Sequence, residues 1–282
     1  MSARAALLIP VVLEVLAAGG CGARRTTFAR HPEAAAAFDR TASDPKALEI
    51  ADQVLAAAGG ADKWNATRQI RWSVSVTTGQ AGMAPIQIEA AWDRWNGRHY
   101  QRLRGEGGDV VVMRNLYESG GTGYYQSGPV TRTLLSGDMD HALGNARERW
   151  ELDTGLMLLP FLLESPGTKL TLAGEAPGEP GQPPLDDLKV TFDPRDPTRT
   201  DTYHAIIDRS THQIARIEIV RHGDPDTKRL GYKVSRWIDI GSGMKLGTVY
   251  ENLGMVGEVI TFTSIAADPE PDETLYVPAV QQ

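Results

Sequence analysis

The sequence predicts a mostly β protein with helices (α+β), built on a large curved antiparallel sheet, or half-open barrel, of about eleven strands. Two observations predict this class. From residue 68 onward, most of the chain alternates apolar and polar residues in short runs separated by turns. That alternation is typical of antiparallel strands with one covered face. Two stretches with helical spacing interrupt it, one at the start and one in the centre, and these helices are expected to cover the concave face.

The N-terminus has the form of a secretory signal. Arg4 supplies a positive charge, Ala5 to Leu16 form a short apolar run, and small residues at 17–20 precede Cys21. A cysteine directly after small residues resembles the lipobox of bacterial lipoproteins, in which the cysteine is lipidated and becomes the mature N-terminus. We therefore expect residues 1–20 to be a signal peptide and Cys21 to carry lipid. An ordinary cleaved signal, or an N-terminal helix with an incidental cysteine, is the alternative.

The expected location is the cell envelope, with the protein anchored in the outer membrane by its N-terminal lipid and facing the periplasm. Gly22 follows the cysteine, where aspartate would resemble an inner-membrane retention signal. Residues 21–44 are rich in Ala, Arg and Thr and have no helix or strand period. They are expected to form the lipidated cysteine and a flexible tether.

The composition argues against several function classes. The net charge is −7 with both signs interspersed, so the chain lacks the basic patch that nucleic acid requires. Cys21 is the only cysteine, which excludes an intrachain disulfide and a thiolate metal cluster. The six histidines lack the i, i+4 spacing of a helical zinc site. We expect no metal and no cofactor.

The folded part is expected to begin with a helix. Asp44 followed by Pro45 is a good helix start, apolar residues recur at helical spacing from Leu48 to Ala58, and Gly59-Gly60 ends the pattern. The period then changes to two. The strands expected before the centre are Ile70–Val76, Ile86–Trp92, Arg98–Leu103, Asp109–Asn115 and Gly123–Tyr125.

The central stretch Trp150–Leu163, WELDTGLMLLPFLL, is the densest apolar run after the signal segment. At helical spacing its large side chains fall on two nearly opposite sides, and only Asp153 and Glu164 share a polar edge. Such a helix is expected to be buried almost all round, with the inner face of the sheet on one side and protein or a ligand on the other. Pro160 should kink or end it, so two short helices or a helix–turn–helix are expected between Met139 and Leu163.

Strands are expected to resume after an exposed, proline-rich loop at Gly174–Pro184. These later strands are Leu188–Phe192, Thr202–Asp208, Ala215–Val220, Leu230–Trp237, Met244–Glu251 and Val259–Ile265. No linker divides them, so residues 45–267 are expected to form a single domain. Residues 268–282 are expected to form a loose C-terminal tail.

The order of these segments resembles the LolA/LolB-like superfamily of bacterial lipoprotein-sorting and lipid-carrying proteins. Most of the resemblance lies in Ala47–Gly60 with Trp72–Val76, and in the hairpin Tyr203–Ile219, YHAIIDRSTHQIARIEI. The resemblance covers roughly residues 45–267 and is one of architecture. It extends to families of the same superfamily that have no assigned function. The resemblance implies an unclosed antiparallel barrel lidded by helices, with acyl chains held between them. Trp150–Leu163 would then be a lid or plug.

The candidate binding site is the lining of that cavity. Ligand sites are concave and mostly apolar, and methionine-rich walls tolerate varied shapes. Large, adaptable side chains on the apolar faces and on the central segment are the candidates: Trp72, Trp92, Trp95, Met113, Trp150, Leu156, Met157 and Phe161. The alternative is that the same side chains form a solid core.

Nothing in the sequence points strongly to catalysis. There is no GxSxG motif. The acidic residues that could pair for acid–base chemistry are placed by strand alternation mainly on wet faces: Asp93, Asp201, Asp208, Glu218 and Glu251. We therefore expect the protein not to be an enzyme.

The leading hypothesis is an envelope lipoprotein that binds a lipid, an acyl chain or a lipoprotein anchor in a hydrophobic half-barrel cavity, in trafficking or sensing. One alternative is a non-catalytic envelope scaffold whose barrel is filled with side chains and which contacts an envelope protein partner. The other alternative is an envelope hydrolase.

Overall fold

The computed structural model describes residues 38–105, 108–118, 122–127, 130–132, 136–178, 180–193 and 199–277. The expected signal peptide, Cys21 and most of the expected tether lie outside the described residues. Residues 38–44, the last part of the expected tether, are described and contact the folded domain. Asp44 donates its backbone N–H to Leu170, and Arg40 forms an ion pair with Asp52 at 2.9 Å.

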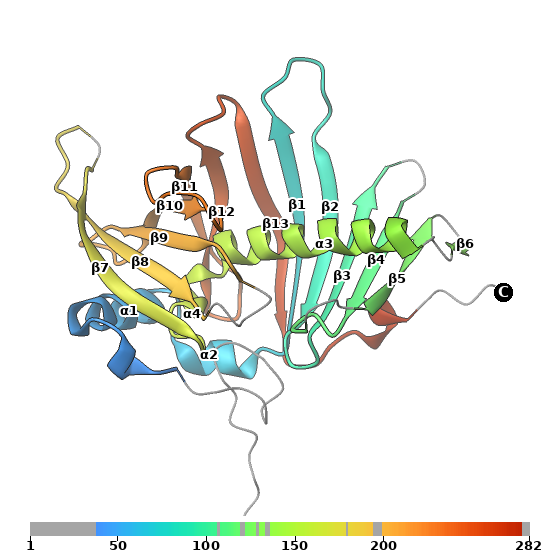
Figure 1. The fold of residues 1–282 in the computed structure, drawn as a ribbon, viewed down its shortest axis with the longest axis horizontal. Helices are drawn as coiled ribbons and strands as arrows, with labels where there is room; N and C mark the ends of the chain where they lie inside the picture. The colour runs from blue at the N-terminus through green and yellow to red at the C-terminus, as the bar shows by residue number, and fades with distance from the viewer. Residues whose placement is uncertain are drawn as a thin grey trace, which may run out of the picture.

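In the described part of the chain, thirteen strands form one curved antiparallel sheet that does not close on itself (Figure 1). They are β1 Gln69–Thr78, β2 Ile86–Asp93, β3 Arg98–Arg104, β4 Val110–Arg114, β5 Thr122–Ser127, β6 Val130–Arg132, β7 Thr168–Ala176, β8 Leu185–Phe192, β9 Thr202–Ile207, β10 Ile214–Val220, β11 Leu230–Asp239, β12 Lys245–Asn252 and β13 Glu258–Asp268. The predicted open antiparallel sheet is confirmed. The prediction of about eleven strands did not include β6 and β7, which the described residues add to the sheet.

The sheet consists of two meanders that meet where β1 pairs with β13. Strands β1 to β6 run outward to one edge, and strands β13 to β7 run outward to the other. The chain must therefore pass from β6 at one edge to β7 at the opposite edge. This geometry explains why the connection between them crosses the concave face.

Helix α3, Ser136–Met157, makes most of that crossing. Its 22 residues extend about 33 Å at a rise of about 1.5 Å per residue. Figure 1 shows α3 lying across the sheet from the β5 side toward β12. None of the described helices is both long enough and apolar enough to span a membrane. Of the two forms expected between Met139 and Leu163, two short helices or a helix–turn–helix, the first is corrected: one long helix is followed, after a break, by a single further helical turn.

The helix break falls just before the predicted proline. Leu158 has φ −106° and ψ 5°, and the short helix α4, Leu159–Leu162, begins after it. Pro160 thus lies in the first turn of α4, where its missing N–H leaves no hydrogen bond unmade. The predicted interruption occurs, and it turns the chain toward β7.

The remaining helices lie at the ends of the sheet. They are the 3₁₀ turn η1 Arg40–Ala42, α1 Pro45–Ala57, α2 Ala61–Ala66 and the 3₁₀ turn η2 Glu273–Tyr276. Asp44 precedes α1 as expected, but its carboxylate accepts from the N–H of Leu172 at 3.1 Å and does not cap the helix. This contact covers part of the otherwise unpaired edge of β7.

The expected loose tail is packed along its described part. Gln69 donates to the hydroxyl of Tyr276 at 3.1 Å, and the guanidinium of Arg98 lies 4.3 Å from the centre of the same ring. Tyr276 is buried with Ala91 and Val112 in a cluster on the outer face of the sheet. The C-terminal segment therefore covers outer-face apolar side chains that strand alternation had been expected to leave wet.

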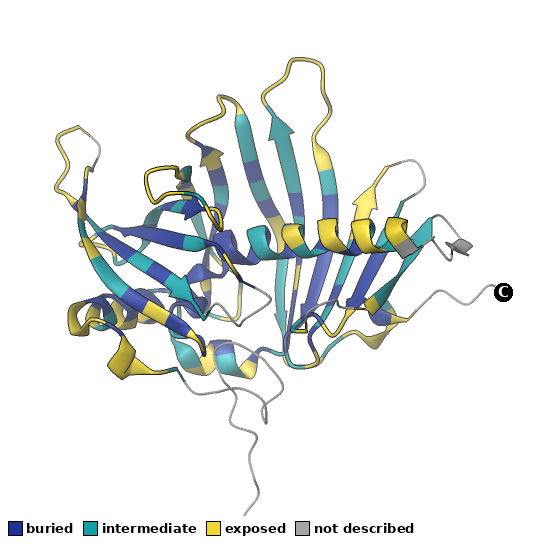
Figure 2. Cartoon of the chain, viewed as in Figure 1, coloured by how far each residue is buried: buried dark blue, intermediate teal, exposed yellow. Residues whose placement is uncertain are grey.

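The main core lies between the inner face of the sheet and the helices. Cross-strand pairs place Trp72 opposite Ala90 and Val74 opposite Ile88, so the apolar faces of β1 and β2 coincide. Figure 2 shows buried residues concentrated beneath and beside α3, whereas the far ends of β1 and β2 are half-buried or exposed. The inner face is covered at its centre and less covered toward that end.

Candidate functional site

A layer of aromatic side chains fixes α3 and α4 to the inner face. The rings of Trp92 and Trp150 meet edge to face with centroids 5.3 Å apart. Trp64 of α2 stacks on Phe161 of α4 at 4.9 Å, with only 10° between the ring planes. Aromatic pairs of this kind contribute about 0.5–1.5 kcal/mol each beyond their buried area. The layer therefore holds the helices firmly where they cross the sheet.

Seven of the eight predicted lining residues belong to this single core: Trp72, Trp92, Met113, Trp150, Leu156, Met157 and Phe161. All seven are buried, and the contacts that bury them come from one another and from neighbouring core residues. Trp95 is separate from them. It is half-buried in the turn after β2, where the guanidinium of Arg68 lies 5.3 Å from the ring centre.

A buried polar contact links α3 to the centre of the sheet. The indole N–H of Trp72 donates to the carboxylate of Asp153 at 2.9 Å, and Arg149, one helical turn earlier, donates to the other oxygen. Burial raises the pKa of Asp153, against the opposing effect of Arg149. Asp153 was expected on a polar edge, but it is fully buried. It is a fastening point between helix and sheet.

His99 lies beside this contact on the inner face. Its ring stacks near that of Trp72, with centroids 6.1 Å apart, and its Nδ1 lies 3.1 Å from the carbonyl oxygen of Ala91. A carbonyl can only accept, so Nδ1 carries the proton. Burial lowers the pKa of His99 to about 4. The imidazole is therefore neutral at physiological pH and contributes polarity without charge.

The apolar inner face continues beyond the area that α3 covers. Cross-strand pairing places Val76 beside Ile86, and Ile88 beside Leu103. We call these four residues the open row. Ile88 is buried, Val76 is half-buried, and the side chains of Ile86 and Leu103 are 44% and 42% exposed. The row therefore runs from the closed core outward to solvent.

A hollow of about 440 Å³ lies between α1 and the ends of β7, β8 and β9. Its apolar lining comes from Ile50, Leu172 and Ile207. Charged side chains also line it, and Arg209 among them bonds both Asp186 and Glu175, at 2.6 and 2.7 Å. The hollow is therefore amphipathic, with its strongest charges paired to each other.

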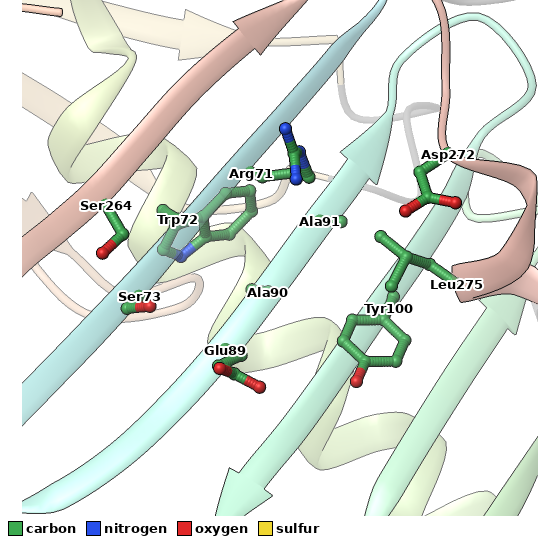
Figure 3. Close-up of a pocket in the computed structure, with 10 residues that line it drawn as sticks. All are labelled: Arg71, Trp72, Ser73, Glu89, Ala90, Ala91, Tyr100, Ser264, Asp272 and Leu275. Carbon is green, nitrogen blue, oxygen red and sulfur yellow. The ribbon is translucent and has the colours of Figure 1, made fainter.

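A second hollow, of about 250 Å³, lies on the outer face between β1–β3 and the C-terminal segment (Figure 3). Figure 3 shows Tyr100, Leu275 and Asp272 around one side of a floor made by Ala90 and Ala91. Its charged groups already have partners. Arg71 bonds Asp268 at 2.8 Å, and Glu89 forms an ion pair with Arg104. We assign this hollow no ligand.

The acidic residues considered for catalysis have structural partners. Asp93 accepts from the backbone of Trp95 and Asn96, and Asp208 accepts from the backbone of Ser210 and Thr211. Their carboxylates stabilise turns. Among the described residues, no group of three or more His, Cys, Asp or Glu side chains is arranged to hold a metal ion.

Two more of those acids lie in charge networks. Asp201 bonds Arg221 at 2.8 Å, and Glu218 bonds Arg216 at 2.7 Å. The fifth, Glu251, is exposed on β12. Asp93 and Asp201 are buried, contrary to the wet faces expected for them, and form ion pairs with Arg98 and Arg221. The other three acids are at least partly exposed, and the five do not share one site.

No protein-family model matches this sequence, and no curated protein is similar to it. The fold has known neighbours. A DUF1329 family protein from Desulfovibrio piger superposes with a TM-score of 0.50 at 12% identity, covering 83% of this chain and 98% of that one. This likeness is one of fold.

Two further neighbours have lower TM-scores. A LolA superfamily protein from Nitrosomonas europaea gives 0.46 at 12% identity, covering 83% of this chain and 97% of the other. An outer membrane lipoprotein-sorting protein domain from Vibrio parahaemolyticus gives 0.47 at 9% identity, covering 82% and 96%. At such identities the likeness concerns the fold alone. The predicted resemblance is confirmed at that level.

Two features of the inner face were not recognised from the sequence. Asp153 was misplaced, although Arg149 at i−4 in an apolar helix is a sign of a buried ion pair. The alternation of Ile86–Trp92 predicts an ordinary strand with one covered face and does not reveal the open row. The signal that could have revealed it was the continued apolar alternation of β2 to its first residue, Ile86, where a covered strand normally becomes polar.

Proposed function

We propose that this protein binds the acyl chain of a lipid or of a lipoprotein anchor on the inner face of its curved sheet, in the bacterial cell envelope. The observation that carries the proposal is the open row. Val76, Ile86, Ile88 and Leu103 form one apolar strip on a concave surface, continuous with the core and reaching solvent. Burying such a strip gains about 25 cal/mol per Å² of apolar surface, without covalent chemistry.

Helix α3 would close the inner end of the binding strip. The acyl chain would lie on the open row, and the end of the acyl chain nearest the core would contact the side of α3. The predicted lining residues around Trp150 are packed against one another, so a ligand would reach them only after α3 had moved. The contact between Asp153 and Trp72 would oppose that movement.

One observation favours a second function, that of a non-catalytic scaffold. Seven of the eight predicted lining residues are buried within a single core, which is how a filled barrel would use them. In this case the protein would act through its surface, on an envelope partner. The two functions differ in whether apolar ligands bind to the open row.

Binding of a fluorescent palmitate analogue by the purified protein tests the proposal. We expect saturable binding that Ile86→Asp and Leu103→Asp each weaken by about tenfold or more, because a charge replaces apolar lining. Val277→Asp is the matched control, since Val277 is also exposed but lies at the end of the described C-terminal segment. Absence of saturable binding, together with no lipid retained in native mass spectrometry, would leave the scaffold.

Membrane attachment through Cys21 is a further part of the proposal. The cysteine follows a signal-like segment, and two or more acyl chains anchor a protein stably. Cys21→Ser is expected to release the protein from bacterial membranes into the soluble fraction. A variant that stays with the membrane through a high-salt and carbonate wash would contradict lipid anchoring.

A further inference from the structure

Exposed apolar side chains gather at one end of the sheet. Of the seven large hydrophobic side chains exposed in the described parts of the chain, only Val277 lies elsewhere. The other six come from the turn between β1 and β2, the adjoining ends of β2 and β3, and the turn between β12 and β13: Met83, Ile86, Leu103, Leu253, Met255 and Val256. Strand register brings these ends together, since Thr78 pairs with Glu258 and Gln87 with Arg104.

The two turns touch through glycines. A Cβ atom on Gly79 would lie 2.4 Å from the carbonyl oxygen of Val256, and one on Gly257 would lie 2.8 Å from the Cα atom of Gly79. Both glycines also have positive φ, of 70° and 83°. Only glycine permits this approach. The turns 79–85 and 253–257 therefore form one surface, which we call the rim tips.

The rim tips are uncharged. No Asp, Glu, Lys or Arg occurs between residues 77 and 88 or between 252 and 257. Charged residues flank the tips on the adjoining strands: Arg104 pairs with Glu89, Glu258 accepts from Asn252 at 2.7 Å, and Glu251 is exposed on β12. A surface of this kind meets no penalty for burying unpaired charge in an apolar medium.

The tips project from the sheet. Val256, in the middle of its turn, is 99% exposed, and Figure 1 shows both hairpins extending beyond α3 on the same side. A projecting apolar surface offers no groove for a peptide or helix. It fits a partner that deforms around it, and the interfacial layer of a lipid bilayer is such a partner.

We propose that the rim tips insert into a lipid bilayer surface and so direct the open row toward the membrane. This inference rests on the proposed function, because the row reaches solvent at the same end of the sheet. An acyl chain would then pass between row and bilayer with little exposure to water. Met83, Met255 and Val256 would make the contact, and Ile86 and Leu103 would lie behind them.

The sole native cysteine allows a direct test in the full chain. Val256→Cys and, as the matched control, Val277→Cys are each made with Cys21→Ser and labelled with an environment-sensitive NBD dye. Vesicles of phosphatidylethanolamine and phosphatidylglycerol are then added. We expect a blue shift and quenching by spin-labelled lipid at position 256, with neither at position 277. The comparison holds even if the N-terminal segment brings the protein to the vesicles.

Equal responses at positions 256 and 277, or no response at 256, would overturn the proposal. A blue shift at 256 that depends on protein concentration without vesicles would overturn it in favour of self-association. As a second measurement, replacing both Met255 and Val256 with Ser should weaken vesicle binding by about tenfold or more, whereas Val277→Ser should not.

The outcomes also separate this inference from the proposed function. Palmitate binding measured without vesicles should be unchanged in the Met255→Ser, Val256→Ser variant, since these residues lie outside the open row. Insertion at position 256 without any palmitate binding would leave the membrane contact and remove the acyl-binding function. Palmitate binding without insertion at position 256 would leave the acyl-binding function and remove the membrane contact.

Discussion

At the residue scale, Asp153 shows how one buried carboxylate positions a whole helix. It accepts from Trp72 on β1 and from Arg149 on its own helix, and it is fully buried. Removing one partner of a buried pair leaves the other charge without compensation, which is more costly than the pair itself is stabilising. The same contact fixes the side of α3 that faces the sheet.

We expect Asp153→Ala to lower the free energy of unfolding by about 3–5 kcal/mol, because the Trp72 N–H and the Arg149 guanidinium lose their acceptor. Asp153→Asn should cost less, since one side-chain oxygen remains. Urea denaturation measures both. A loss below about 1 kcal/mol for the alanine variant would mean that the contact does not hold α3 in place.

The pH dependence of the same variants has a definite sign. The pKa of Asp153 is raised above its ordinary value of 3.8 by burial, so the folded state keeps the proton longer than the unfolded state. The contribution of Asp153 to the free energy of unfolding is therefore complete below pH 3.8 and is lost as the pH rises through the raised pKa. As the pH rises from 3.8 through the raised pKa, the free energy of unfolding of the wild type should therefore fall relative to that of Asp153→Asn.

His99 gives the opposite sign. Burial lowers its pKa from 6.5 to about 4, so its contribution to stability is present above 6.5 and is lost as pH falls toward 4. In an NMR titration we expect its ring signals to stay constant from neutral pH down to about pH 5. Titration with a midpoint near 6.5 would show that the ring is open to water.

At the element scale, α3 approaches the sheet closely only where its glycine permits. A Cβ on Gly155 would lie 2.5 Å from the hydroxyl oxygen of Tyr203, whereas one on Gly144 of the same helix would meet no atom within 4 Å. The C-terminal half of α3 is therefore fitted to β9, and its N-terminal half faces solvent on that side. Two glycines in one helix thus have different roles.

These two glycines should respond oppositely to alanine. Gly144→Ala should stabilise the protein by about 0.5–1 kcal/mol through helix propensity. Gly155→Ala should destabilise it by about 1–3 kcal/mol through overpacking. Tyr203→Phe should recover part of that loss by removing the closest atom. Thermal unfolding compares the variants, and stabilisation by Gly155→Ala would show that α3 does not lie close to β9.

Most elements follow from local pattern, and the exceptions have physical reasons. Strands such as β1 and β2 were predicted because apolar residues alternate cleanly along them. Strand β7 was not, because a register shift between Leu172 and Gly174 interrupts its alternation next to a proline-rich loop. Strand β6 has three residues, too few to show a period.

At the scale of the whole molecule, local pattern predicts which side chains are apolar but not which remain uncovered. The eight lining candidates are large apolar residues, and seven of them lie in the main core. Helix α3 covers these side chains, and its path depends on the connection between β6 and β7 at opposite edges of the sheet. The open row and the packed C-terminal segment depend on contacts such as Gln69 with Tyr276, about 200 residues apart along the chain, which no local pattern reveals.

The two parts of the molecule therefore have distinct roles in our account. The centre of the inner face is closed by the packing of Trp92 against Trp64 and Trp150, and this packing positions α3. The end formed by β1, β2 and β3 leaves an apolar strip open beside the rim tips. The amphipathic hollow near α1 is the competing place for a ligand.

Photo-crosslinking with palmitate carrying a diazirine at its methyl end, followed by mass spectrometry of the labelled peptides, tests the central claim most directly. We predict saturable cross-links on β1 to β3, at or beside Val76, Ile86 and Leu103, that unlabelled palmitate suppresses. Saturable cross-links confined to the hollow lined by Ile50 and Ile207, or labelling that unlabelled palmitate does not suppress, would contradict acyl binding on the open row.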